Sequence, residues 1–304
     1  MSPPLPPVYE GRIWHNTTVQ GALGLFESQV LWASQFDCMN DPSENSWGWR
    51  VIKDRYLQRK NEFTSRVQEQ FDETFSYDMR QDWMRQIYIV SASLSENSLD
   101  QFRAYGQVSV EVPNGIWTQH SSERRYNPHW QRAVWRPLIY DPSEALVYID
   151  AMLDCCAEII NGPEEWDFTD EGLTALTAMR SLALLIKHPA YKSETEVRLI
   201  IDLVPHAIRG EHTRKVAVPG DATTPETHVE IEYIEVRPEF DLDGKEPAPI
   251  LVQSVLLGPV FAFDESIPNL TAHAQALLPK VPPMSVSDIP YRERGQQPFP
   301  PLTP

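Results

Sequence analysis

"YKSETEVRLIIDL", residues 191–203, is the stretch that decides the fold class. Charged and apolar side chains alternate through it: Glu194, Glu196 and Arg198 form one set, and Val197, Leu199 and Ile201 the other. This period of two predicts a half-buried β-strand, and a surface edge strand would explain it as well as a site. Residues 143–161 and 169–188, just before it, have the apolar spacing of two helices.

Helical and strand patterns are mixed along the rest of the chain, with neither βαβ alternation nor an internal repeat. Helices are expected at about 17–30 and 55–86, and the second carries an aromatic stripe at every fourth residue that predicts a bend or break. Further short strands are expected at 31–34, 87–93, 107–113, 133–140, 214–219, 228–238 and 250–260. The pattern predicts an α+β fold, with a mixed, largely antiparallel sheet and packed helices.

Proline is concentrated at the two ends of the chain, where no helix or strand period is visible. We therefore expect an extended N-terminal arm over residues 1–7 and a proline-rich C-terminal tail over 271–304, in which the residues after about 280 pack little against the core. Either arm could bind a partner protein. Between them, residues 8–270 are expected to form one α+β domain with a helical insertion at about 143–188.

Charge and cysteine content limit the possible partners and compartment. The net charge of -17 disfavours indiscriminate binding to nucleic acid or to a membrane surface. The three cysteines, of which Cys155 and Cys156 are adjacent, do not form a disulfide framework. With no signal peptide and no long apolar run, the sequence predicts a cytoplasmic protein with reduced thiols and no membrane partner. No metal is expected, because the cysteines and histidines lack ligand spacing.

Polar residues interrupt the predicted elements at the N-terminal end. "GRIWHNTT", residues 11–18, places Arg12 and His15 on the expected first strand and Thr17 directly before a helix. A histidine that is simply hydrogen-bonded at a strand end would explain His15 equally well.

A stiff turn follows the strand at 31–34. In "NDPSE", residues 40–44, Asn40 and Asp41 favour a turn, proline fixes φ, and the segment ends in Glu44. This corner is either a structural stop or the wall of a site.

Hydroxyl groups mark the end of the strand at 87–93. "SASLSENSLDQFRAYG", residues 91–106, carries Ser91, Ser93 and Ser95 at alternate positions, and a short helix then presents Arg103 and Tyr105. A row of hydroxyls on an apolar strand is unfavourable unless each one finds a hydrogen-bond partner.

Taken in order, these stretches resemble the DUF2971 family of bacterial and phage proteins, which have no assigned function. The matching segments are residues 14–17, 31–44, 93–106 and 191–199. This resemblance covers much of residues 12–200 but implies no particular chemistry.

The chain also resembles the mono-ADP-ribosyltransferases. Their signature is an Arg or His on the first strand, then a Ser-x-Ser strand, then a Glu-x-Glu or single Glu on a later strand. The matching residues here are Arg12 or His15, Ser93-Leu94-Ser95 or Ser91-Ala92-Ser93, and Glu194-Thr195-Glu196. The resemblance implies a mixed split sheet and a cleft that binds NAD as the substrate.

Roles for individual residues follow from this resemblance. Glu196 would stabilise the ribosyl cation that forms as nicotinamide leaves, and Glu194 would activate the acceptor. The expected NAD-binding residues are Arg12, His15, Thr17, Ser93, Ser95, Arg103 and Tyr105. The expected cleft wall is Asn40, Asp41 and Glu44, with Arg103 paired to one of these acids.

The resulting hypothesis is transfer of ADP-ribose from NAD to a macromolecular acceptor, as a toxin or in phage defence. Two alternatives stay open. One is a non-catalytic binding or inhibitory module of a defence system. The other is a nuclease that holds Mg²⁺ with the carboxylates Asp41, Glu44, Glu194 and Glu196.

Overall fold

The computed structural model describes most of the chain. The described residues are 4–36, 44–76, 87–119, 132–162, 170–202, 212–218, 227–238, 251–259, 266–278 and 280–289. Asn40 and Asp41 of the expected cleft wall lie outside them, as does the side chain of Glu44.

Strands and helices alternate irregularly along the chain. The strands are β1 (Ile13–Thr17), β2 (Leu31–Gln35), β3 (Tyr88–Ser93), β4 (Val108–Val112), β5 (Trp117–Gln119), β6 (Trp135–Pro137), β7 (Glu196–Ile201), β8 (His212–Val218), β9 (Thr227–Pro238), β10 (Ser254–Leu257) and β11 (Met284–Val286). The helices are α1 (Val19–Ser28), α2 (Glu44–Arg59), α3 (Ser65–Ser76), α4 (Leu99–Tyr105), α5 (Pro142–Ile160), α6 (Asp170–Leu185) and α7 (Ser266–Leu277), with 3-10 turns η2 (Lys60–Glu62) and η6 (Pro189–Glu194).

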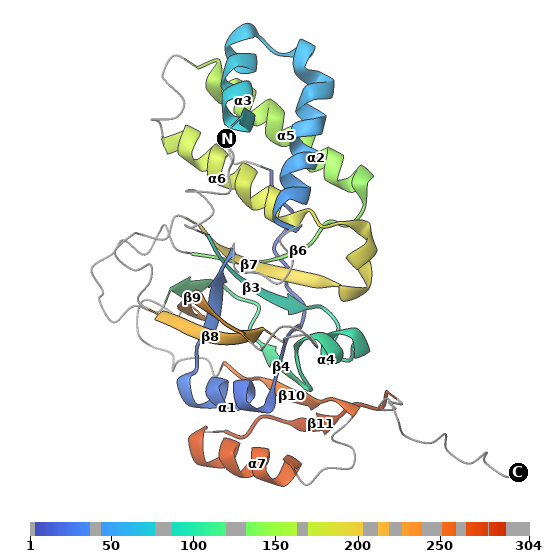
Figure 1. Ribbon diagram of the computed structural model, residues 1–304, viewed down its shortest axis with the longest axis vertical. Coiled ribbons are helices and arrows are strands. Elements are labelled where there is room, and N and C mark those ends of the chain that lie inside the picture. Colours follow the sequence, from blue (N-terminus) through green and yellow to red (C-terminus); the bar gives the residue numbers. More distant parts are fainter. Residues whose placement is uncertain are drawn as a thin grey trace, which may run out of the picture.

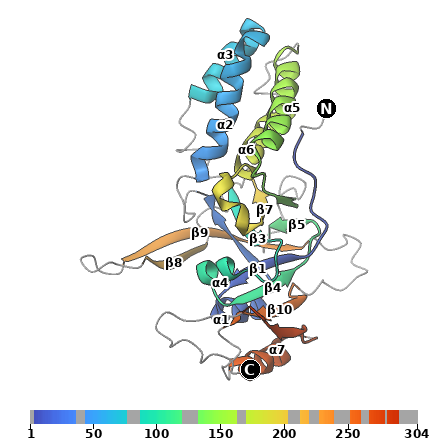
Figure 2. The same cartoon turned by 90° about the vertical axis from the view of Figure 1, so that its right-hand side faces the viewer.

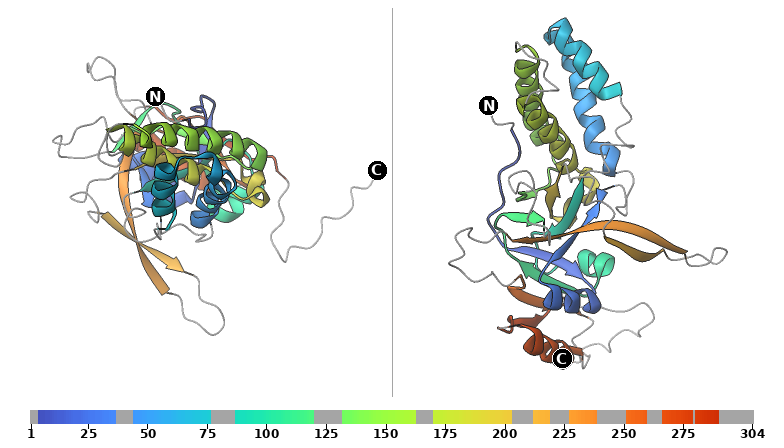
Figure 3. Two further views of the ribbon diagram at one scale, coloured as in Figure 1. Left: turned by 90° about the horizontal axis from the view of Figure 1, so that it is seen from above. Right: turned by 90° about the vertical axis from the view of Figure 1, so that its left-hand side faces the viewer.

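All the described strands belong to one sheet, with the order β11-β10-β4-β1-β3-β2-β9-β5 along its main path. Every pairing is antiparallel except that of β10 with β11, so the sheet is mixed and the predicted α+β class is confirmed. Strands β8 and β9 form a long hairpin that projects from the body of the molecule (Figures 2 and 3).

The sheet forks at β3. Strand β7 pairs with β3 over the whole of Tyr88–Ser93 and so occupies one edge. On the other edge β2 reaches only Tyr88 and Ile89, while β1 reaches only Ser93. Since a strand has two edges, β1 and β2 share the second one, and the sheet opens between them beside residues 90–92.

Two large hydrophobic cores lie above and below this fork. One fills the face of the sheet that α1 and α7 cover, with Phe26 and Ala274 among its buried side chains. The other lies inside a lobe of α2, α3, α5 and α6, at the top of Figure 1. The predicted helices at 143–161 and 169–188 are α5 and α6. The helix expected at 55–86 is interrupted at η2, which lies before Phe63, the first residue of the aromatic stripe.

The boundary expected for the C-terminal tail is wrong. Helix α7 crosses residue 270, and Ala274 and Leu278 are buried in the sheet core. Beyond it, β11 pairs in parallel with β10. The flanking prolines concealed a strand of only three residues, too short for its alternation to be recognised.

The N-terminal arm lies against the body of the protein. Leu5 packs on the core of the helical lobe, and the backbone N–H of Tyr9 donates to the carbonyl of Trp135 at 2.9 Å. The arm therefore spans from the lobe to β6. Within the described part of the chain, no helix combines the length and the apolar character that crossing a bilayer requires.

Candidate functional site

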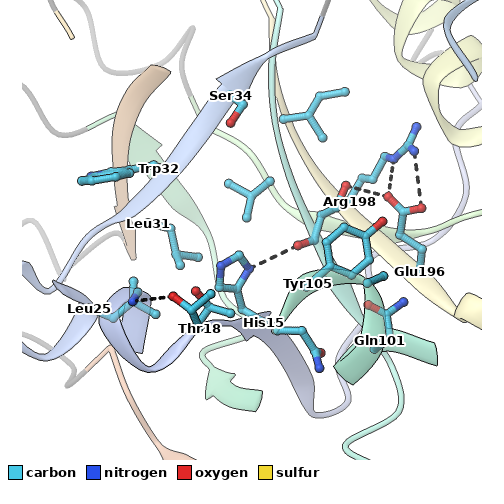
Figure 4. Close-up of a pocket in the computed structure, with 18 of the residues that line it drawn as sticks. His15, Thr18, Leu25, Leu31, Trp32, Ser34, Gln101, Tyr105, Glu196 and Arg198 are labelled. Atoms are coloured by element: carbon cyan, nitrogen blue, oxygen red, sulfur yellow. Dashed lines mark hydrogen bonds and ion pairs between the residues drawn. The ribbon is translucent and has the colours of Figure 1, made fainter. Parts of the chain in front are cut away.

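A cavity of about 870 Å³ lies at the fork of the sheet. Its walls come from β1, α1, β2, β3, α4, η6 and β7, and Figure 4 shows the side chains that face it. The volume is within the range of natural ligand sites, of about 300–1,000 Å³. We call this cavity the fork cleft.

His15 lies on β1 at the centre of the fork cleft. Its Nδ1–H donates to the carbonyl oxygen of Ser91 at 3.3 Å. Neither β1 nor β2 pairs with β3 at Ser91, so the imidazole takes the place of a strand partner there. The histidine thus ties β1 to β3 at the opening.

Ser91 connects this histidine to the acidic end of the fork cleft. Its hydroxyl donates to Glu196 Oε1 at 2.6 Å. Ser91 is directly opposite Arg198 on β7, and Glu196 is the next residue of β7 on the same face. Diagonal neighbours of this kind on one face of a sheet are close enough for the contact. His15, Ser91 and Glu196 therefore form a continuous line across β1, β3 and β7.

Ser93 and Ser95, the serines expected to bind NAD, do not line the fork cleft. Ser93 is fully buried, and its hydroxyl donates to the carbonyl of Glu194 at 3.3 Å and accepts from the N–H of Ser95 at 3.0 Å. Strand register explains why Ser93 and Ser95 are not at the site: of the three serines, only Ser91 lies beside the opening between β1 and β2. Of the two possible Ser-x-Ser pairs, Ser91-Ala92-Ser93 is the one at the cleft.

Glu196 is the most tightly held group of the site. Its carboxylate accepts from Arg198 Nε at 2.7 Å and from Lys187 Nζ at 2.7 Å, besides Ser91. The side chain is only 6% exposed. Burial by itself would raise the pKa of Glu196, but the charges of Arg198 and Lys187 outweigh it and lower the pKa to about 2. Glu196 is therefore ionised throughout the physiological range.

Glu194 lies closer to solvent, with its side chain 22% exposed. Lys187 Nζ also donates to Glu194 Oε2 at 2.6 Å, so one lysine bridges the two glutamates. Between them Thr195 has a φ of 43°, in the left-handed region that β-branched residues avoid. This turn lies between η6 and β7, and it places the carboxylates of Glu194 and Glu196 on either side of it, both within hydrogen-bond distance of Lys187.

Lys187 and Arg198 were not among the expected site residues. Lys187 is 3% exposed on its side chain and also lies over the ring of Tyr191, at 4.9 Å from the centroid. The available signal was a charged residue directly after an apolar helix, at the end of "LALLIK". Such a residue is normally exposed, so finding it buried requires acidic partners.

Helix α4 forms another wall of the fork cleft. Ser98 caps it, and Gln101 donates to the carbonyl of Glu194 at 3.3 Å. Tyr105, as expected, lines the cavity, and it is 42% exposed. Arg103 is exposed and is not among the residues that line the cavity, and the side chains of the acids expected to pair with it lie outside the described residues.

Arg12 also lies outside the fork cleft. Its guanidinium pairs with Glu111 at 2.7 Å and with Glu96 at 3.0 Å, and its side chain is 59% exposed. Glu111 and Glu96 hold the Arg12 guanidinium away from the cavity lining, whereas His15 lies beside Ser91 at the opening. His15, rather than Arg12, is the first-strand residue at the cleft.

The start of α1 forms a further wall. Thr17 lines the cavity as expected, while Thr18 caps the helix by accepting from the N–H of Gly21 at 3.1 Å. Gly106, at φ 124°, packs so closely here that a Cβ would lie 2.5 Å from the backbone of Thr17. Only glycine allows α4 to end against this wall.

The carboxylates of the nuclease alternative are only partly placed. Glu194 and Glu196 both face Lys187, while Asp41 and the side chain of Glu44 lie outside the described residues. Among the residues that are described, no three His, Cys, Asp or Glu side chains form a group suited to a metal ion.

Comparisons with protein-family models, with curated proteins and with solved structures gave no match for this chain. The two family resemblances therefore stay predictions.

Proposed function

We propose that the fork cleft binds NAD and that the protein transfers ADP-ribose to a macromolecular acceptor. The observation that supports this most strongly is the line of His15, Ser91 and Glu196 across three strands at a fork in the sheet. These residue types occur in the chain order of the transferase signature. The cavity volume of about 870 Å³ suits a dinucleotide.

In this proposal the carbon–nitrogen bond between ribose and nicotinamide breaks, and its electron pair leaves with nicotinamide. The ribose carries a developing positive charge, which the ionised carboxylate of Glu196 stabilises. Glu194 accepts the proton that the acceptor loses as its nucleophilic atom bonds to the ribose. His15 and Tyr105 hold the dinucleotide between them.

The donors around Glu196 determine how it can meet a ribose hydroxyl. Ser91 and Arg198 hold Oε1, while Lys187 and the second Arg198 nitrogen approach Oε2 at 2.7 and 3.4 Å. A ribose hydroxyl must therefore displace one donor. Lys187 is the group best able to move, because Glu194 gives it a second carboxylate.

This crowding also favours the second candidate, a binding module without catalysis. A carboxylate paired with both Lys187 and Arg198 is the arrangement expected of an internal clamp. In that case the fork cleft holds a ligand or a partner segment, and its glutamates only keep the strands together.

The deciding experiment is incubation of the full-length protein with labelled NAD, scoring nicotinamide release and labelling of a cell lysate. His15→Ala and Glu196→Gln should each lower the rate about 10²-fold, since a positioned group acting in the transition state is worth that much. Melting curves confirm that each variant is folded.

Glu111→Gln is the matched control. Glu111 pairs with an arginine and a serine, Arg12 and Ser254, much as Glu196 does, but it lies outside the cleft lining. Its variant should keep the wild-type rate. If the wild-type protein neither binds NAD nor releases nicotinamide, the transferase proposal fails. Equal losses in Glu196→Gln and Glu111→Gln would show a general loss of folding instead.

A further inference from the structure

Aromatic residues border the fork cleft at a distance from Glu196. Trp32 of β2 lines the cavity, and 44% of this residue is exposed. Its ring stacks on Tyr233 of β9, with centroids 4.5 Å apart and planes at 29°. Ile231, also on β9, lines the cavity and is 8% exposed. We call Trp32, Tyr233 and Ile231 the aromatic wall.

The register of the strands places the aromatic wall on the same face of the sheet as the acidic end. Ser34 is opposite both Tyr233 on β9 and Ile89 on β3. Directly opposed residues point to one face, and so do residues two apart on a strand. Trp32, Ser91 and Arg198 therefore share a face, and in Figure 4 Trp32 and Glu196 lie on opposite sides of His15.

We propose that the aromatic wall binds the planar base of a nucleotide, which for NAD is the adenine. The inference rests on the proposed function, because it assigns the second ring of the same dinucleotide. A tryptophan supported by a second ring is a rigid apolar surface, and nucleobases stack on such surfaces whatever their hydrogen-bonding edge.

The spacing of the strands fits this assignment. Strands β2 and β7 lie on either side of β3, and β2 leaves β3 beyond Ile89, so Trp32 and Arg198 are separated by at least two interstrand spacings, or about 10 Å. A base stacked on Trp32 therefore lies well away from a ribose bound at Glu196. Two riboses and a diphosphate bridge such a separation, and they would pass His15 on the way.

Charge supports the same orientation. The carboxylates and cations of the fork cleft gather at Glu194, Glu196, Lys187 and Arg198, where charge develops during transfer. The aromatic wall is apolar apart from the hydroxyl of Tyr233 and the indole N–H. A neutral adenine is suited to that end, and the cationic nicotinamide is suited to the acidic one.

The test is calorimetric titration of the full-length protein with AMP, comparing Trp32→Ala with Trp32→Phe. Truncation to alanine removes the stacking surface and should weaken AMP binding roughly tenfold or more, while phenylalanine should restore most of it. Leu57→Ala, which shortens an exposed apolar side chain of α2 outside the cavity lining, should leave AMP affinity unchanged. Melting curves for all three variants exclude misfolding.

The outcomes separate this inference from the proposed function. If Trp32→Ala binds AMP as the wild type does, or if Leu57→Ala weakens AMP binding equally, the aromatic wall is not the base site. If the wild type does not bind AMP at millimolar concentration, the inference is also overturned. AMP binding that depends on Trp32, in a protein that does not cleave NAD, would support the aromatic wall and overturn the transferase proposal. NAD cleavage that Trp32→Ala leaves unchanged would support the transferase proposal and overturn the aromatic wall.

Discussion

At the scale of single residues, the site depends on charges that are buried together. Glu196, Lys187 and Arg198 are each almost inaccessible to solvent, and each would be unstable there without the others. Lys187 joins Glu196 to the more accessible Glu194. This arrangement fixes the ionisation of Glu196 before any ligand binds.

Substituting Glu196 should therefore destabilise the fold strongly and in a pH-dependent way. Glu196→Gln leaves Arg198 and Lys187 without their shared carboxylate, which should lower the free energy of unfolding at pH 7 by about 3–5 kcal/mol. The folded pKa of Glu196 is about 2, below its ordinary value, so its stabilisation is present above the ordinary pKa and is lost as pH falls towards 2. The difference between wild type and variant should shrink as pH is lowered below 5, measured by urea unfolding.

Glu62→Gln is the control for this measurement. Glu62 pairs with Arg59, but its side chain is 60% exposed, so removing its charge should change stability by less than about 1 kcal/mol. A pH-independent loss in Glu196→Gln, or an equal loss in Glu62→Gln, would contradict the assignment.

At the scale of elements, helix packing in the lobe depends on close backbone approach. Gly48 of α2 faces α6, and a Cβ there would lie 1.9 Å from the carbonyl oxygen of Ala183. Helices this close leave no room for a methyl group. Gly24 of α1 is also helical, but nothing lies within 4 Å of its Cβ position.

The same substitution at these two glycines should have opposite effects. Gly48→Ala forces α2 away from α6 and should destabilise the protein by about 1–3 kcal/mol. Gly24→Ala fills open space in a helix and should stabilise it by about 0.5–1 kcal/mol, because alanine is the better helix former. Urea midpoints measure both, and a Gly48→Ala variant as stable as the wild type would show that α2 and α6 are not held this closely.

At the scale of the whole molecule, the C-terminal segment completes the sheet. Strand β11 covers β10, and beyond it the N–H of Ser287 donates to the carbonyl of Leu257 at 2.7 Å. The hydroxyl of Ser287 donates to Asn97 at 2.6 Å, which ties this end to the loop before α4. Residues far apart in sequence thus support one wall of the fork cleft.

Two truncated chains test this role. A chain that ends at residue 289 keeps β11, whereas one that ends at residue 282 loses it and leaves β10 as an open edge. The shorter chain should melt about 4 °C or more below the longer one, as expected for a loss of ~2 kcal/mol in a protein of this size. Equal melting temperatures would show that β11 adds nothing to stability.

The sequence by itself determined the type of most elements and the fold class. Local patterns decide these features: a short apolar run predicted β3, alternation predicted β4 and β7, and apolar spacing with cap or turn residues predicted α1 and α5. Glu196, His15 and Tyr105 were expected at the site from the resemblance to the mono-ADP-ribosyltransferases, and all three line the fork cleft.

Only the tertiary structure decided which of those residues meet. The fork at β3 selects Ser91 over Ser93 and Ser95, and Glu111 and Glu96 hold Arg12 outside the cavity while His15 lines it. Lys187 becomes part of the site only because Glu194 and Glu196 fold onto it. These contacts depend on register between strands distant in sequence, and residue spacing along one chain carries no information about that register.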